Sequence, residues 1–120
     1  MSEVYKPTVA IDFDGVINPM TCGYLIADRV PPDSPTVGIK ELIDELRNNN
    51  YQVVVMTCRC SFPGGGKSVQ EYLDMYNIEV DLITNKKVPA IVYLDDRGIQ
   101  FDGNTNGLMN KIKNFKPWHQ

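Results

Sequence analysis

The chain carries four short runs of apolar residues that predict buried strands. The run at 51–57 is nearly continuous, which is typical of a strand that is covered on both faces. The runs occupy residues 8–13, 51–57, 80–84 and 90–94. The first run leads directly into two carboxylates, Asp12 and Asp14. Because a buried charge is costly unless another group compensates it, this strand end is the first candidate for chemistry.

Between these runs, the apolar residues change to helical spacing, and a first helix is expected at 34–48. Its apolar positions follow the i, i+3, i+4, i+7 pattern and are Ile39, Leu42, Ile43 and Leu46. Ser34 and Pro35 fit an N-cap followed by proline at the first helical position. The three asparagines at 48–50 are expected to end this helix.

Two more helices are expected, at 67–76 and near the carboxyl terminus. The first of them follows a glycine-rich loop at 62–66. The last helix has one apolar face, formed by Leu108, Ile112 and Phe115. Its expected cap lies near Asn104 or Thr105, because such side chains accept hydrogen bonds from the first backbone N–H groups.

Strands that alternate with helices predict an α/β fold with a mostly parallel central sheet and helices on both faces. A length of 120 residues favours one domain, spanning 1–120, that is large enough to bury its own core. The segment "NKKVPA" between the third and fourth predicted strands gives only about six residues, whereas a parallel crossover usually needs about a dozen. The third strand is therefore either short or irregular, or not a regular parallel neighbour, and we expect this segment to pass close to the carboxyl edge of the sheet.

The residues that follow the strands carry the candidate chemistry. Ligand sites in parallel sheets lie at the carboxyl ends of the strands, so these residues should converge. In chain order they are Asp12 and Asp14, Thr57 and Arg59, Asn85, Lys86 and Lys87, and Asp95, Asp96 and Arg97. Crowded carboxylates repel one another, and a divalent cation removes that conflict. Oxygen ligands of this kind suit Mg²⁺, which keeps several waters and also binds substrate phosphate.

The same groups suit the transfer of a phosphoryl group. Asp12 is a candidate nucleophile that would form an aspartyl-phosphate, and Asp14 is a candidate for handling the proton of the leaving group. A lysine and a hydroxyl would bind the remaining phosphate oxygens.

Composition and charge restrict the classes of binding partner and the cellular location that we expect. The formal net charge of −3 argues against a nucleic-acid backbone as the main partner, although a local basic groove would still allow such binding. No apolar run approaches the roughly 20 residues of a membrane helix. The three cysteines do not form a disulfide framework, and the amino terminus has no pattern of a secretory leader, so a cytoplasmic location is expected.

Four motifs, in order from residue 12 to residue 96, resemble those of the haloacid dehalogenase-like (HAD) superfamily of phosphohydrolases. The first is Asp12-Phe13-Asp14-Gly15-Val16, which matches the pattern D-x-D-x-[TV]. The second is the apolar strand "VVVMT" that ends at Thr57, and the third is a lysine in "TNKKVPA". The fourth is the acidic pair Asp95-Asp96 in "VYLDD". The resemblance implies a three-layer Rossmann-like (HAD-like) fold in a minimal form without a cap domain.

The resemblance also implies a Mg²⁺-dependent phosphatase that hydrolyses a phosphate monoester. Asp12 would be the nucleophile and a metal ligand. Asp14 would be the general acid and base and would bind the metal through its backbone carbonyl. Asp95, together with Asp96, would complete the metal site.

Thr57 and Lys87 would hold the transferring phosphoryl group. Lys87 is preferred over Lys86, because related minimal sequences place the lysine three residues before the alanine that opens the strand. Arg59 has two interpretations: a structural ion pair, or a contact with substrate phosphate.

Only 42 residues separate Asp14 from Thr57, and a helix uses about 15 of them, so the rest can form a short flap but no cap. An open crevice suggests a macromolecular phosphorylated substrate or a partner subunit that closes the site in a homo-oligomer.

Other functions fit the residues less well. A receiver-like phosphoacceptor domain uses similar groups but places its acidic pair after the first strand and its acceptor after the third, where this chain has Thr84 and Asn85. A Walker-type phosphate loop at 63–68 would need glycine where Ser61 stands. A four-ligand zinc site would need all three cysteines and the single histidine, His119, which lies near the terminus, so ordinary thiols are the favoured interpretation of the cysteines. A catalytically silent binding domain of the same fold is the remaining alternative.

Overall fold

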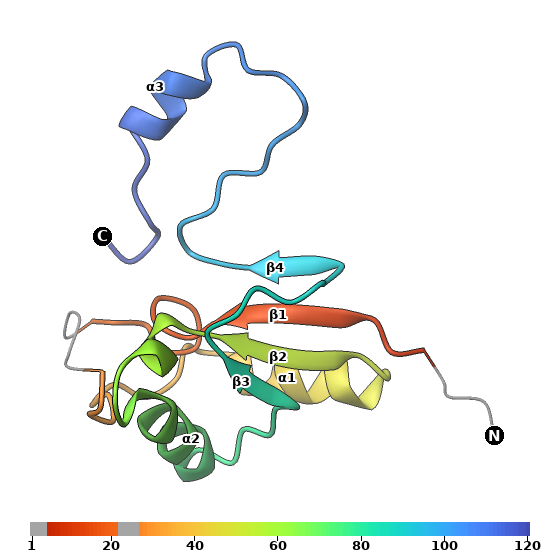
Figure 1. The fold of residues 1–120 in the computed structure, drawn as a ribbon, viewed down its shortest axis with the longest axis vertical. Coiled ribbons are helices and arrows are strands. Elements are labelled where there is room, and N and C mark those ends of the chain that lie inside the picture. Colours follow the sequence, from red (N-terminus) through yellow and green to blue (C-terminus); the bar gives the residue numbers. More distant parts are fainter. Residues whose placement is uncertain (1–4, 22–26) are drawn as a thin grey trace.

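The computed structural model describes residues 5–21 and 27–120, so Cys22 lies outside the described residues. The strands are β1 (Thr8–Asp12), β2 (Gln52–Met56), β3 (Leu82–Thr84) and β4 (Val92–Leu94). The helices are α1 (Ile39–Asn48), the 3₁₀ helix η1 (Cys58–Ser61), α2 (Gly65–Met75) and α3 (Leu108–Lys113). Figure 1 shows the four strands and the three α-helices in the order expected from the sequence. η1 was not expected, and each strand is shorter than its apolar run.

The four strands form one parallel sheet in the order β3-β2-β1-β4, which confirms the α/β fold with a parallel sheet. β1 is an inner strand, and its residue Val9 is in register with Val53 of β2 on one side and Val92 of β4 on the other. The chain therefore builds outward from β1 in one direction through β2 and β3, and then crosses to the opposite edge for β4.

Helices α1 and α2 pack on the same face of this sheet. Side chains alternate between the two faces of a strand, and the odd-numbered residues of β1 and β2 join both helices in one core. The core side chains include Val9, Ile11, Phe13, Val53 and Val55 from the strand segments and Ile39, Ile43, Val69, Tyr72 and Leu73 from the helices. The rings of Phe13 and Tyr72 meet edge to face, with 5.2 Å between their centroids.

The opposite face is crossed by the segment between β3 and β4 rather than by a packed helix. Seven residues, 85–91, span three strand spacings of about 4.8 Å each, which is within reach of an extended chain. Tyr93 lies on this second face, and its hydroxyl donates a hydrogen bond to the carbonyl of Val88 at 2.6 Å. The expected helical layer on this face is not confirmed, because α3 contains no buried residue.

The ends of α1 and α2 follow from their sequences. Each helix is followed by an asparagine in the left-handed conformation, Asn50 after α1 and Asn77 after α2. The next N–H groups, of Tyr51 and Ile78, return to the carbonyls of Leu46 and Leu73, which is the Schellman arrangement. The asparagines at 48–50 thus end the first helix as expected.

The beginning predicted for α1 was wrong by five residues. The helix starts at Ile39 instead of Ser34, because Gly38 adopts a left-handed φ of 85°. Thr36 is held by tertiary contacts: its N–H donates to the carbonyl of Ile17 at 2.9 Å, and its hydroxyl donates to that of Val16 at 2.5 Å. The cap expected near Asn104 or Thr105 was also wrong, since α3 begins after Gly107.

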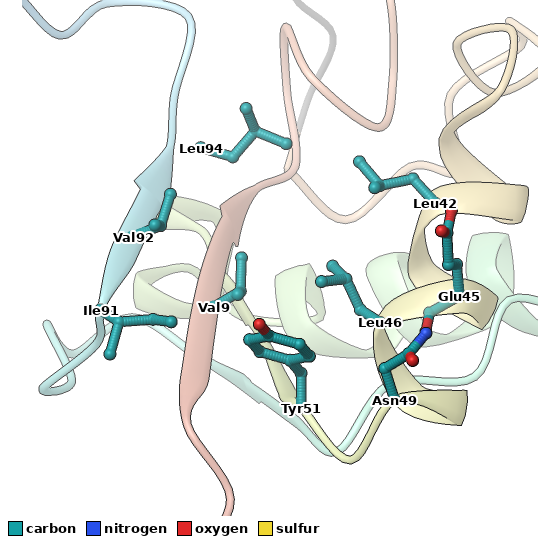
Figure 2. A pocket seen from close by; sticks show the side chains of 9 residues that line it. All are labelled: Val9, Leu42, Glu45, Leu46, Asn49, Tyr51, Ile91, Val92 and Leu94. Carbon is teal, nitrogen blue, oxygen red and sulfur yellow. The ribbon is translucent and has the colours of Figure 1, made fainter.

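The β4 side of the molecule is open. A groove of about 610 Å³ runs between α1 and strands β1 and β4, and Figure 2 shows the apolar side chains that line it. They include Val9, Leu42, Leu46, Tyr51, Ile91, Val92 and Leu94. The C-terminal segment with α3 extends away from the sheet in Figure 1. The radius of gyration of 15.5 Å accordingly exceeds the roughly 14 Å expected for a compact chain of this length.

Candidate active site

Three carboxylates meet at the carboxyl ends of β1 and β4, where the order of the strands along the sheet changes direction. Asp12 is the last residue of β1, and Asp95 and Asp96 directly follow β4. One carboxylate oxygen from each residue lies within 4.8 Å of the other two. Because β1 connects to β2 on one side and pairs with β4 on the other, this is the crevice where parallel α/β sheets bind ligands. The convergence of residues 12, 95 and 96 expected from the sequence is therefore present.

The three carboxylates of this cluster repel one another when all of them are ionised, and the pKa values of Asp12 and Asp96 reflect this. Burial raises the pKa of the Asp12 carboxyl to about 8, and a hydrogen bond with Asp96 and the charges of Asp95 and Asp96 act in the same direction. Burial also acts to raise the pKa of Asp96, but hydrogen bonds with His119 and Asp12 outweigh it and lower that pKa. Without a cation, the pair Asp12–Asp96 thus holds one proton near neutral pH.

The donor atoms fit a hard divalent cation. Oδ1 of Asp96 is buried and has no hydrogen-bond partner in the described parts of the chain, which is costly for a carboxylate oxygen unless an ion or water meets it. Asp12 keeps one oxygen bonded to the N–H of Phe13 at 2.9 Å, and exposed Asp95 accepts from the N–H of Arg97 at 2.7 Å. Oxygen ligands that are part buried and part exposed suit Mg²⁺ with several retained waters.

A small cleft of about 190 Å³ lies next to the carboxylates. Its lining includes Asp12, Thr57, Cys58, Ser61, Asn85, Tyr93 and Asp95. Thr57 directly follows β2 and is only 4% exposed. Its Oγ1 accepts a hydrogen bond from the N–H of Arg59 at 3.2 Å and so caps η1, which leaves the hydroxyl proton for an acceptor in the cleft. Thr57 is thus placed beside Asp12, as expected.

Arg59 is placed as a structural ion pair. Its guanidinium is 1% exposed and grips Asp14 with two bonds, Nε to Oδ2 at 2.7 Å and NH2 to Oδ1 at 3.0 Å. NH1 donates to the carbonyls of Ala27 and Arg29. Of the two interpretations of Arg59, this geometry favours the structural one and gives no support to its predicted role in substrate binding.

Asp14 does not join the acidic cluster through its side chain. Besides Arg59, its Oδ1 accepts a bond from Nδ2 of Asn18 at 2.9 Å, across a tight turn in which the N–H of Gly15 donates to the carbonyl of Asn18. A bidentate arginine and an amide thus hold both oxygens of this carboxylate in place. Its geometry is that of a residue that organises the loop after β1.

The two candidate lysines, Lys86 and Lys87, differ in their contacts. Nζ of Lys87 lies 5.2 Å from the centroid of the Tyr93 ring, and Tyr93 lines the cleft. The backbone N–H of Lys86 instead bonds to Oγ1 of Thr84 at the end of β3. Lys87 is thus next to a wall of the cleft, although neither lysine is among its lining residues.

The glycine-rich segment 63–68 packs against the back of this site. A side chain at Gly65 would meet the carbonyl oxygen of Arg59 at 1.7 Å, so glycine is needed for the close approach. Ser68 is buried and its hydroxyl lies 2.6 Å from the carbonyl of Ala27, the same carbonyl that accepts from Arg59. The segment therefore serves packing around Arg59.

Two residues of the site had no signal in the sequence. Nε2 of His119 lies 2.7 Å from Oδ2 of Asp96, and Nε1 of Trp118 donates to the carbonyl of Gly15 at 2.6 Å. Residues 15 and 118 are 103 positions apart. No local motif links a histidine near the carboxyl terminus to an aspartate after a strand, so only the fold could bring them together.

Comparisons of this chain with models of protein families, with characterised proteins and with solved structures found no match. Among the described residues, no helix has both the length and the apolar character that crossing a bilayer requires.

Proposed function

We propose that this chain is a Mg²⁺-dependent phosphatase that hydrolyses a phosphate monoester through an aspartyl-phosphate on Asp12. The observation that supports it is the meeting of Asp12, Asp95 and Asp96 within 4.8 Å, beside a cleft that contains Thr57. The order of motifs that resembles the HAD superfamily agrees with this placement. Membership of that superfamily, with its three-layer Rossmann-like fold, is part of the same proposal.

The chemistry requires little covalent machinery. A carboxylate oxygen of Asp12 attacks phosphorus, the ester P–O bond breaks, and the alcohol leaves with a proton supplied by Asp14, the candidate general acid. Water then attacks phosphorus and gives a proton back to Asp14, the bond to Asp12 breaks, and inorganic phosphate is released. When bound by Asp12, Asp95 and Asp96, Mg²⁺ supplies charge neutralisation of the phosphoryl oxygens. The hydroxyl of Thr57 and the ammonium of Lys87 would hold those oxygens in place.

The role of Asp14 needs its own experiment, because Arg59 and Asn18 bind its carboxylate away from the acidic cluster. The variant Asp14→Asn should be compared on an aryl phosphate, whose leaving group needs no proton, and on an alkyl phosphate, whose leaving group does. Loss confined to the alkyl ester would assign general acid catalysis to Asp14. Equal loss on both esters, together with a lower melting temperature, would assign it the structural role.

The open cleft limits the class of substrate and the partner subunit that we propose. The described part of the segment between β1 and α1 forms turns and no separate domain. A phosphorylated macromolecule is therefore the substrate class we favour, and closure of the site by a second copy of the chain is the alternative, which gel filtration tests. A cytoplasmic location belongs to the proposal as well, since Cys58 and Cys60 are free thiols.

The decisive test is hydrolysis of an aryl phosphate with Mg²⁺, with EDTA, and by the variant Asp12→Asn. We expect activity with Mg²⁺ that falls by at least about 100-fold in either of the other two conditions. Activity that survives in Asp12→Asn would rule out the assigned nucleophile. A stable phosphoaspartate without turnover would favour the receiver-like alternative, and Mg²⁺ binding without any phosphoryl chemistry would favour a silent binding domain.

A further inference from the structure

The C-terminal residues Trp118 and His119 bind both loops that carry the acidic site. The indole N–H of Trp118 donates to the carbonyl of Gly15, directly after the Asp12–Asp14 motif. His119 bonds to Asp96, in the loop after β4. An ionised carboxylate only accepts, so Nε2 of His119 carries the proton and donates to Oδ2 of Asp96. Two adjacent side chains thus join the end of β1 to the end of β4.

This contact is buried and closely packed. The side chains of His119 and Asp96 are 7% and 2% exposed. A side chain at Gly15 would lie 2.1 Å from Oδ2 of Asp96 and 2.9 Å from Nε2 of His119. The loop after β1 therefore approaches the His119–Asp96 pair as closely as a glycine allows.

The bond to His119 determines which oxygen of Asp96 is left for a ligand. Oδ2 is occupied by His119, while Oδ1 is buried and without a partner among the described residues. The side-chain ion pair with Arg97 is long, 3.9 Å, and Arg97 is 60% exposed. Partners that hold one atom of a metal-ligating side chain fix the direction of its other atom, and their loss typically weakens metal binding by 10- to 100-fold.

The loop that carries Asp96 needs such support. β4 is three residues long, pairs with β1 alone among the described strands, and all three residues are exposed. Its loop continues into a segment whose helix α3 has no buried residue. Within the described residues, the C-terminal tail supplies the buried side-chain contact that ties this loop to the rest of the site.

From this geometry we infer that His119 is a positioning residue, which orients Asp96 so that its free oxygen meets the cation beside Asp12, and that Trp118 anchors it. The inference rests on the proposed metal site but not on the phosphatase reaction. It adds to the acidic cluster a residue, contributed by the opposite end of the chain, that touches neither substrate nor metal.

The test measures Mg²⁺ binding by calorimetry on the full chain, independently of activity. We expect His119→Ala to raise the dissociation constant by about 10- to 100-fold. His119→Gln, which keeps an N–H donor at a similar reach, should stay within about 3-fold of the original chain. The neighbouring variant Gln120→Ala is the matched control and should leave the constant unchanged. Melting temperatures measured alongside show whether each variant folds.

The outcomes separate this inference from the proposed function. Equal Mg²⁺ affinity of His119→Ala and the original chain would overturn the positioning role, as would an equally weak His119→Gln that is fully folded. Mg²⁺ binding that depends on His119, without phosphatase activity, would support the positioning role and overturn the proposed function. No Mg²⁺ binding by the original chain would overturn both. If His119→Ala fails to fold, His119→Leu, which fills similar space but has no N–H donor, takes its place in the comparison with His119→Gln.

Discussion

The two halves of this molecule have strands of similar apolar character and very different packing. In the β1–β2 half, Val53 and Val55 are completely buried beneath α1 and α2. In the β4 half, Val92 is 51% exposed and Tyr93 is 43% exposed, and the following helix, α3, contains no buried residue. The difference teaches that an apolar strand becomes part of a core only where the topology supplies a second layer.

The candidate active site lies on the boundary of these halves. Asp12 comes from the packed half, and Asp95 and Asp96 come from the open half. Its geometry therefore depends on whatever holds the halves together at this edge, which includes the pairing of β4 with β1 and the contacts of Trp118 and His119. Matched substitutions in the two halves test this view of the molecule.

The largest difference is expected between two arginines. Arg59→Ala would leave Asp14 without its bidentate partner in a site where the two side chains are only 1% and 13% exposed. We expect a loss of about 3–5 kcal/mol in the free energy of unfolding. Arg97→Ala removes an ion pair that is long, 3.9 Å, and whose arginine is 60% exposed, so it should cost less than about 1 kcal/mol. Urea denaturation measures both, and equal losses would contradict the comparison.

A slightly smaller difference is expected between two isoleucines. Ile43 of α1 is fully buried, so Ile43→Ala should cost about 2–4 kcal/mol, through lost transfer free energy and a cavity. Ile112 of α3 is 57% exposed, and Ile112→Ala should change stability by no more than about 0.5 kcal/mol. A large loss in Ile112→Ala would show that α3 is packed in solution, and gel filtration of that variant would then tell whether a second copy covers it.

Alanine substitutions at two glycines with positive φ distinguish the cost of a steric clash from the cost of backbone strain alone. Gly15 has φ 90° and lies against Asp96 and His119, whereas Gly107 has φ 74° and open space around it. Gly107→Ala should cost about 1 kcal/mol for the left-handed conformation alone. Gly15→Ala should cost about 2–3 kcal/mol, because its neighbours must also move, and it should weaken Mg²⁺ binding. Unchanged Mg²⁺ binding in Gly15→Ala would contradict the close packing at the boundary.

The smallest expected effect is a pH dependence of stability without metal. Asp12 has a pKa of about 8 in the folded chain and 3.8 as a free side chain. Its protonated form therefore stabilises the fold fully below about pH 4, and this contribution is lost as the pH rises through 8. Allowing for partial solvent screening, we expect a loss of about 2 kcal/mol between pH 5 and pH 8.5 in EDTA.

Asp96 does not contribute to this slope, because its pKa is lowered from 3.8 and it therefore titrates below the measured pH range. Two controls accompany the measurement. Excess Mg²⁺ should restore stability at pH 8.5 by binding the folded state, and Asp12→Asn should remove the slope. A slope that persists in Asp12→Asn would assign it to another group.

The elements and most of the acidic site could be predicted from the sequence, for a physical reason. Apolar periodicity records which faces are buried, and the carboxyl ends of parallel strands meet at one edge, so Asp12, Thr57 and the pair at 95–96 converge by topology alone. The end of α1 could also be predicted from its asparagines, because few residues other than glycine and asparagine adopt the left-handed conformation that ends a helix.

Other features could not be read from local patterns, because they depend on contacts between distant segments. Thr36 looks like part of a helix, yet its bonds to Val16 and Ile17 hold it outside α1. The sequence allowed either role for Arg59, and the fold turned it towards Asp14. His119 carries no motif at all, and its place beside Asp96 arises only when the carboxyl terminus returns to the end of β4. Periodicity describes the environment of each residue, whereas a partner 20 or 100 positions away is specified only by the packed chain.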